Sequence, residues 1–244
     1  MSALKITILG CGSSFGVPLF HNIWGKCDPD ELKNRRTRPS ILVQKNGKNL
    51  LIDTSPDLKQ QFLSNKIDNI DAVFYTHEHA DHTHGINELR SINLIHGKII
   101  PCYGNKQTMD KINNSFNYLF ENTEKSYYPA ILSNNLFSSN EFDIFGINIK
   151  LISQNHGNID SIGFIFDDKV AYNLDVKYFY DQDGYFKRIE NIDHWIVGCL
   201  RIDPHISHAS LSEVKEWLNL VKPKNAYLSH MTAHLDYQDT LKYL

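Results

Sequence analysis

Residues 76–85 read THEHADHTHG, which places four histidines, a glutamate and an aspartate within ten positions. A histidine is costly to bury without a partner, and several protonated histidines in one short stretch would repel one another. A fold that keeps this stretch together therefore needs something that binds imidazoles.

The spacing within this stretch favours metal binding. His77 and His79 are two residues apart after an apolar run, so an extended chain points both to the same side. Asp81 and His82 follow where the chain is expected to turn. Imidazole and carboxylate are ligands for zinc, manganese or iron, and the H-x-H-x-D-H pattern offers two pairs, enough to begin two adjacent sites. The alternative is a polar loop that arose by chance.

Further side chains of the same types end apolar runs elsewhere in the chain. His156 ends IKLISQNH, Asp175 ends VAYNLD, and His230 ends NAYLSH. A lone histidine at such a place is more often a hydrogen-bonded structural residue. Three such ends, taken with the first stretch, favour a metal site to which several strands deliver ligands at one rim.

The apolar patterning predicts strands and helices in both halves of the chain. In the first half we expect strands at 4–10, 71–76 and 99–104, a hairpin at 40–55 that turns at Asn46-Gly47, and helices at 57–67, 85–97 and 106–120. In the second half we expect hairpins at 142–153 and 161–175, strands at 194–200 and 225–230, and helices at 210–222 and 236–244. This order predicts an α/β fold of two sheets with helices outside, in one domain spanning residues 1–244.

Composition restricts the partners and the compartment. The formal net charge of −3 and the pI near 6.4 do not suggest a general nucleic-acid or membrane binder. The N-terminal apolar run is too short for a signal peptide, and no stretch reaches membrane-spanning length. The four cysteines are far apart and form no C-x-x-C pair. We therefore expect a cytoplasmic protein.

Four motifs carry a resemblance to a known family: GCGSSFGVP, NRRTRPSILV, THEHADHTHG and LDY near the C-terminus. With them the chain resembles the metallo-β-lactamase-fold hydrolase superfamily. Within it, the chain is similar to the branch that contains the phosphoribosyl cyclic-phosphate phosphodiesterase of phosphonate metabolism. The resemblance covers nearly the whole chain and implies a four-layer αββα sandwich with metals at one edge of the sheets.

The resemblance also assigns roles to individual residues. It implies two divalent metal ions, zinc or manganese, that activate a water molecule between them. The first ion would be bound by His77, His79 and His156, the second by Asp81, His82 and His230, and Asp175 would bridge both. Asp53, in LLIDTS, matches a carboxylate that orients a ligand histidine, although a turn or cap role explains it equally well.

The PHISH segment supplies a candidate catalytic residue. His208 matches a histidine that phosphodiesterases of the superfamily place beside the metals, where it would stabilise a phosphoryl oxygen or protonate the leaving group. Asp81 would orient the nucleophile in addition to binding metal. For His205 we expect a plain loop role, and the role of Arg201 is left open.

Two regions leave questions open. A short charge run is usually solvated, yet Arg35, Arg36 or Arg38 can also meet an anionic substrate. The phosphodiesterase branch often carries a cysteine-rich loop with a structural zinc at the position of residues 19–30. This chain has Cys27 there, with His21 nearby and His234 far along the chain, and we expect no structural zinc.

The function that these observations predict is hydrolysis of a small anionic phosphodiester or nucleotide, such as a cyclic phosphodiester, by a binuclear metal centre. Alternatives are a tRNA 3′-processing endonuclease, a thioester or lactam hydrolase, and a non-catalytic metal-binding protein. No long basic arm for tRNA is evident, and seven intact ligand positions argue against loss of catalysis. The substrate, the metal and the oligomeric state, including a homodimer, are left open.

Overall fold

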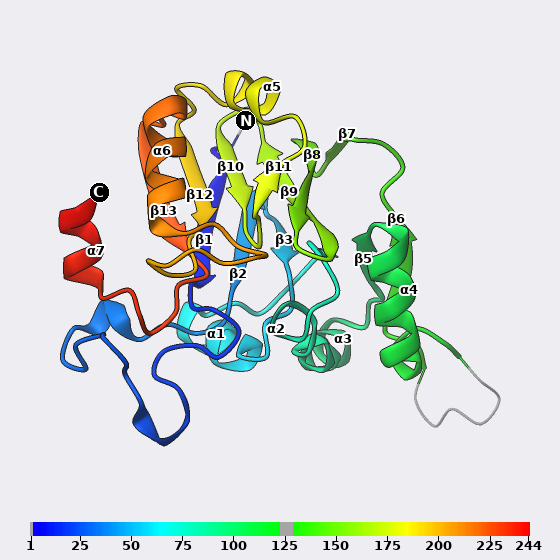
Figure 1. Cartoon of the computed structure of the whole chain (residues 1–244). Coiled ribbons are helices and arrows are strands. Elements are labelled where there is room, and N and C mark those ends of the chain that lie inside the picture. Colours follow the sequence, from blue (N-terminus) through cyan, green and yellow to red (C-terminus); the bar gives the residue numbers. More distant parts are fainter. Residues whose placement is uncertain (1, 123–128) are drawn as a thin grey trace. The chain divides into compact units, whose positions relative to one another are not determined.

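Two sheets organise the described residues, 2–122 and 129–244, of the computed structural model (Figure 1). Each sheet belongs to one of two units. The first unit contains residues up to Leu9 and Ser40–Ser139, and the second unit contains Gly10–Pro39 and Asn140–Leu244. The predicted mixed α/β class with two sheets is thereby confirmed.

The sheet of the first unit has the strand order β1-β2-β3-β4-β5-β6. Its strands are β1 (Lys5–Gly10), β2 (Ser40–Lys45), β3 (Lys48–Ile52), β4 (Ala72–Phe74), β5 (Ile100–Gly104) and β6 (Leu132–Leu136). β2 and β3 form the predicted antiparallel hairpin, and Asn46 and Gly47 both have the positive φ that its tight turn requires. β3 to β6 run parallel, so their carboxyl ends share one edge.

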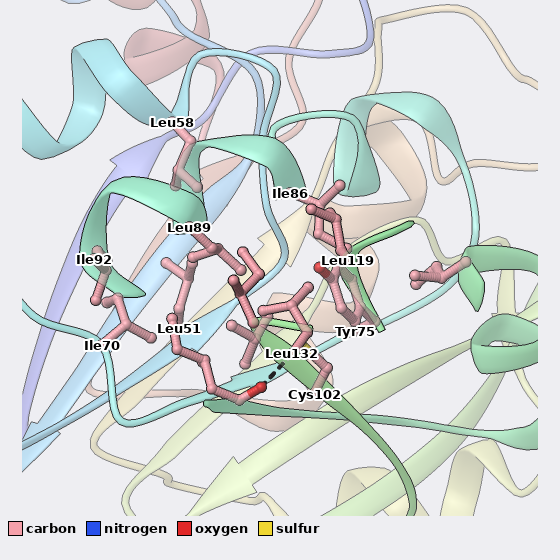
Figure 2. Packing of buried hydrophobic residues seen from close by; sticks show 14 of the residues in the cluster. Leu51, Leu58, Ile70, Tyr75, Ile86, Leu89, Ile92, Cys102, Leu119 and Leu132 are labelled. Atoms are coloured by element: carbon pink, nitrogen blue, oxygen red, sulfur yellow. Dashed lines mark hydrogen bonds between the residues drawn. The ribbon is translucent and has the colours of Figure 1, made fainter. Parts of the chain in front are cut away.

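The longer helices of the first unit bury apolar side chains, whereas the short α2 buries Asp81, His82 and Thr83. They are α1 (Leu58–Asn65), α2 (Ala80–Thr83), α3 (Leu89–His96) and α4 (Lys106–Ser115), with 3-10 turns η3 (Ile86–Glu88) and η4 (Asn117–Leu119). Figure 2 shows Leu89 and Ile92 of α3 in the same apolar cluster as Leu51 of β3 and Cys102 of β5. Gly97 follows α3 directly, and its positive φ provides the predicted C-cap.

The sheet of the second unit has the order β11-β8-β9-β10-β12-β13, with β7 paired to β8. Its strands are β7 (Glu141–Ile144), β8 (Ile147–His156), β9 (Ile159–Phe166), β10 (Val170–Asn173), β11 (Tyr178–Phe179), β12 (His194–Gly198) and β13 (Asn225–Ser229). β8 and β10 are both antiparallel to β9 and so run in the same direction, and β10, β12 and β13 are parallel. The carboxyl ends of these four strands therefore meet at one edge.

The second unit also contains α5 (Gln182–Arg188), α6 (Leu211–Val221), α7 (Tyr237–Tyr243), η1 (Phe20–Asn22) and η2 (Leu32–Asn34). The capping box of Ser210 and Glu213 starts α6 as predicted, and α6 buries Trp217 against the same cluster as Trp195 of β12. Within the described part of the chain, no helix is both long enough and apolar enough to cross a membrane.

Candidate metal centre

Four residues that follow β4 form the first histidine cluster: His77, His79, Asp81 and His82. The ring centre of His77 lies 4.6 Å from that of His79 and 4.3 Å from that of His82. His82 Nε2 is 3.5 Å from Asp81 Oδ2. His77, Asp81 and His82 are buried and His79 is exposed. The short helix α2 begins after His79 and places Asp81 and His82 on the turn that was expected.

Asp53 orients two histidines of this cluster. It follows β3 directly, is fully buried, and accepts hydrogen bonds from His82 Nδ1 (2.7 Å), Thr76 Oγ1 (2.8 Å) and the Thr76 backbone N–H (2.8 Å). Because the Thr76 hydroxyl donates to Asp53, its oxygen accepts from His77 Nδ1 at 2.9 Å. Both imidazoles are thus held in the tautomer whose lone pair is on Nε2. Burial raises the pKa of Asp53, and the contacts with His82 and Thr76 oppose that rise.

The backbone fastens this cluster to the loop after β3. The Thr54 N–H donates to the His82 carbonyl at 2.8 Å, and the Gly85 N–H donates to the Thr54 carbonyl at 2.9 Å. A Cβ at Gly85 would lie 1.9 Å from the Ser55 carbonyl oxygen, so no larger residue fits there. The glycine that closes the THEHADHTHG motif is therefore needed for this close approach.

The second unit carries the second histidine cluster: His156, Asp175, His208 and His230. His156 is the last residue of β8, Asp175 lies just beyond β10, and His230 follows β13. Asp175 Oδ1 lies 3.6 Å from His156 Nε2, 3.6 Å from His208 Nδ1 and 3.3 Å from His230 Nε2. One carboxylate oxygen thus faces three imidazole nitrogens at the edge where these strands end.

Unusual backbone conformations direct these side chains. Asp175 and His230 have φ of 50° and 56°, a left-handed conformation that is uncommon outside glycine and often found at functional sites. His156 Nδ1 donates to the Ser207 carbonyl at 2.8 Å, which leaves the Nε2 lone pair directed at Asp175. Gly157 also has positive φ, and a Cβ there would lie 2.7 Å from Ser207 Cβ.

His208 lies within this cluster, whereas His205 lies at its border. The His208 ring stacks on His230 at 4.9 Å and meets His156 edge-on at 4.6 Å. Burial lowers the pKa of His208 to about 3, and the neighbouring histidines add to this against the attraction of Asp175. His205 Nδ1 instead contacts Ser207, and burial, followed by Arg201, lowers the pKa of His205.

The donor set fits divalent metal ions. Imidazole nitrogen and carboxylate oxygen suit zinc and manganese. In His77, His82 and His156 the Nδ1 atom is bonded to Thr76, Asp53 and Ser207 respectively, the arrangement that metal-ligating histidines use to orient Nε2. Within the second unit, ligand atoms of His156, Asp175 and His208 lie within 4.8 Å of one another.

The arginines of residues 35–38 and Arg201 differ in surroundings. Arg36 is buried and donates to Asn34 Oδ1 at 2.9 Å and to the Thr232 carbonyl at 3.3 Å, so its role is structural. Arg35 is exposed and stacks over Trp24, and Arg38 is half-buried. Arg201 donates to the carbonyls of the loop that follows it.

The LDY motif, residues 235–237, is joined by hydrogen bonds to the loop at residues 19–34. Asp236 Oδ2 accepts from Asn34 Nδ2 at 2.6 Å and from the Asp28 N–H at 3.1 Å. Cys27 is buried and its thiol contacts the Leu235 carbonyl at 3.4 Å, while His21 and His234 are exposed. Asp236 also caps α7. The motif thus fastens the loop to the C-terminal segment.

Several residues that orient the side chains of the two clusters were not predicted from the sequence. Thr76 immediately precedes His77 in the motif, so its position beside a predicted ligand could have marked it as an orienting residue. Ser207 acts through its carbonyl oxygen, which every residue possesses, and no sequence signal marks it. Gln154, Ser161 and Asn173 form a buried polar network beneath Asp175 and read in the sequence as ordinary strand residues.

Comparison with known proteins identifies the family. Residues 48–231 match the model of the beta-lactamase superfamily domain. The chain therefore belongs to this superfamily of metal-dependent hydrolases, which share the metallo-β-lactamase fold. The sequence resemblance that led to this expectation is confirmed.

A solved diphosphatase of the PhnP family is 29% identical and superposes with a TM-score of 0.87, covering 99% of this chain and 92% of that one. The anti-Pycsar protein Apyc1 of Paenibacillus harenae is 24% identical over 96% of this chain and 92% of its own length. An octanoyltransferase of Porphyromonas gingivalis is 27% identical over 95% of this chain, which spans only 46% of that relative's length.

Proposed function

We propose that the two histidine clusters together bind two divalent metal ions, zinc or manganese, and that the protein hydrolyses small phosphodiesters. The observation that carries the proposal is the Asp175 carboxylate, whose Oδ1 faces three imidazole nitrogens at 3.3–3.6 Å. Asp175 lies beside one histidine of each proposed ligand set, His156 and His230, which suits its assignment as the ligand that both ions would share.

The proposed ligand sets follow the family pattern. One ion is assigned to His77, His79 and His156, the other to Asp81, His82 and His230, and Asp175 is shared. When bound, two such ions would supply an activated water at neutral pH and would neutralise charge on phosphoryl oxygens. All seven positions lie within residues 48–231, the part of the chain that matches the superfamily model, which supports this division.

The chain's own groups have separate tasks in this proposal. Asp53 and the Ser207 carbonyl hold the ligand rings in their tautomers. Asp81 orients the attacking water. His208, packed between His156 and His230, donates a hydrogen bond to the phosphoryl group or to the leaving oxygen.

The proposed substrate is a small phosphodiester, such as a cyclic nucleotide or cyclic sugar phosphate. The negative net charge gives the chain little long-range attraction for a polyanion such as tRNA. A diphosphate diester is the second candidate, because the diphosphatase of the PhnP family superposes on 99% of this chain. Both substrates present a phosphoryl centre with an oxygen leaving group.

The free cysteines support a cytoplasmic site of action. Cys27, Cys102 and Cys199 are buried, and burial raises the pKa of each thiol. Thiols that are buried and have raised pKa values are unreactive packing residues. Cysteines that are free and not disulfide-bonded suit a reducing compartment, and on this ground we propose a cytoplasmic site of action.

The test compares kcat/KM across a substrate panel with protein loaded with zinc or manganese. The panel contains bis(p-nitrophenyl) phosphate, 2′,3′-cyclic nucleotides, ADP-ribose, a thioester, nitrocefin and a tRNA precursor with a 3′ trailer. We expect the highest value for a small phosphodiester and none after chelation. A higher value for ADP-ribose selects the second candidate, and a higher value for nitrocefin, the thioester or the tRNA precursor refutes the phosphodiesterase proposal.

A further inference from the structure

Two aspartates in different units share an unusual environment. Asp53 and Asp175 each follow a strand, each has a left-handed backbone, with φ of 63° and 50°, and each is buried. In both cases a fully buried serine from a neighbouring strand donates its hydroxyl to the aspartate's own carbonyl oxygen: Ser40 to Asp53 at 2.9 Å, and Ser161 to Asp175 at 2.8 Å.

We propose that Ser40 and Ser161 are positioning residues that lock these two aspartates in the left-handed conformation and thereby set the metal affinity of the site. The inference rests on the proposed metal centre. It concerns the backbone of Asp53 and Asp175 and assigns no metal contact to either serine.

Ser40 acts at the end of the first unit's hairpin. Its hydroxyl also lies 2.9 Å from the Ile52 carbonyl, so one proton is shared between two successive carbonyls where β3 ends. A buried carbonyl that leaves the strand ladder needs another donor. Ser40 supplies it, and the turn directs the Asp53 carboxylate toward Thr76 and His82.

Ser161 acts from β9 and is itself held in place. Gln154 Nε2 donates to Ser161 Oγ at 3.0 Å and also to the Leu174 carbonyl. The two carbonyls at Leu174 and Asp175 are therefore both bound by buried side chains. The peptide groups before and after Cα of Asp175 are therefore both held by hydrogen bonds from buried side chains.

The network beneath Ser161 extends into the core. Asn173 Nδ2 donates to Gln154 Oε1 at 3.0 Å, and Asn173 Oδ1 accepts from Tyr185 Oη (2.6 Å) and Trp195 Nε1 (2.8 Å). A Cβ at Gly163 would lie 2.3 Å from Asn173 Nδ2, so the network also requires a glycine on β9. A satisfied network of this kind fixes one conformation.

Loss of the Ser40 or Ser161 hydroxyl should allow Asp53 or Asp175, respectively, to leave its left-handed conformation. A left-handed backbone is disfavoured for L-residues, although aspartate adopts it more readily than most. Without its serine, each aspartate would lose the hydrogen bond that holds it there and would move toward extended values. Its carboxylate would then turn away from His82, for Asp53, or from His156, His208 and His230, for Asp175. The ligands would be present but poorly aligned.

The experiment uses Ser40→Ala and Ser161→Ala in the full chain, with two matched controls. Ser55→Ala removes a fully buried hydroxyl of the first unit that bonds Asp57 and Gln61. Ser210→Ala removes the N-cap of α6 in the second unit. Zinc affinity is measured by competition with a chromophoric chelator, and folding by thermal unfolding of the metal-free protein.

We expect Ser40→Ala and Ser161→Ala each to weaken zinc binding about 10–100-fold, the range found for groups that orient metal ligands. Ser210→Ala should lower Tm without changing zinc affinity, and Ser55→Ala should leave the affinity unchanged. Ser161→Cys, which is similar in size and retains a weak donor, should restore part of the loss and serves if Ser161→Ala does not fold.

The outcomes separate this inference from the proposed function. A wild-type protein that binds zinc, with alanine variants that bind it equally tightly, overturns the positioning role. An equal loss in the two controls also overturns it, because a general structural effect would then explain the change. A wild-type protein that binds no zinc refutes the metal centre itself.

Discussion

The two histidine clusters use the same kinds of side chain but are assembled in different ways. The first takes all its residues from positions 77–82, a single loop and one short helix. The second takes its residues from 156 to 230, delivered by β8, β10, β13 and the loop before α6. A local motif fixes the first cluster, whereas the second depends on the direction of strands in its sheet.

Asp53 and Asp175, the two aspartates with a left-handed backbone conformation, also differ in what their carboxylates contact. Asp53 accepts three hydrogen bonds from Thr76 and His82, so its carboxylate serves to orient other groups. Asp175 faces three imidazole nitrogens. The same backbone conformation therefore presents an orienting carboxylate in one unit and a candidate ligand in the other.

The largest effect is expected from Asp175→Ala. Because Asp175 is the one ligand proposed for both ions, its loss should lower metal content from two ions per chain to one or none and abolish turnover. Elemental analysis after zinc or manganese loading measures this. His77→Ala, which changes one proposed site only, is the comparison and should retain one ion. Two ions retained by Asp175→Ala would contradict the shared role.

The next effect concerns His208. His208→Ala should keep the metal content but lower kcat about 10²–10³-fold, the usual cost of removing a hydrogen-bond donor to the reacting group. His205→Ala, at the border of the same cluster, is the control and should change kcat little. Metal content that falls in step with activity would make His208 a ligand, and an unchanged rate would make it structural.

Most elements could be predicted because their signals are local. The Asn46-Gly47 hairpin, the Gly97 cap and the Ser210–Glu213 capping box occur as expected. β6 (LSNNL) and α5 (QDGYFKR) were missed because the first is polar and the second contains a glycine and only two buried side chains. Strand order depends on contacts between distant residues, which no local pattern encodes.

The residues of the candidate site also differ in whether a local sequence signal marks them. Residues 77–82 were recognised from their spacing, and the strand-end positions of His156, Asp175 and His230 from apolar runs. Their assignment as ligands stays a prediction. The Ser40 and Ser161 hydroxyls were not found, since a buried serine in a strand gives no pattern that separates a positioning role from packing.

A smaller effect is expected from Asp53→Asn. An amide in place of the carboxylate puts an N–H where Thr76 or His82 now donates, so the orientation of His82 should be lost. We expect metal affinity to fall about 10–100-fold. Asp236→Asn is the matched control, because Asp236 is also buried and hydrogen-bonded but belongs to the α7 cap. Equal affinity losses in both variants would argue against an orienting role for Asp53.

Asp236→Asn itself should have the smallest effect on metal affinity. It should, however, clearly lower the free energy of unfolding. Although burial raises the pKa of Asp236, hydrogen bonds from Asp28, Asn34, Asp239 and Gln238 lower it to about 2, from the ordinary 3.8. A carboxyl whose pKa is lower in the folded state stabilises the fold above its unfolded-state pKa, and this contribution is lost as the pH falls toward the folded-state value.

Urea unfolding of Asp236→Asn at pH 7 should show a free energy of unfolding about 1.5–3 kcal/mol below that of wild type, typical of hydrogen bonds to a charged group. At pH 3 the difference from wild type should shrink. A loss that is the same at both pH values would mean that packing, not charge, holds the LDY motif to the loop at residues 19–34.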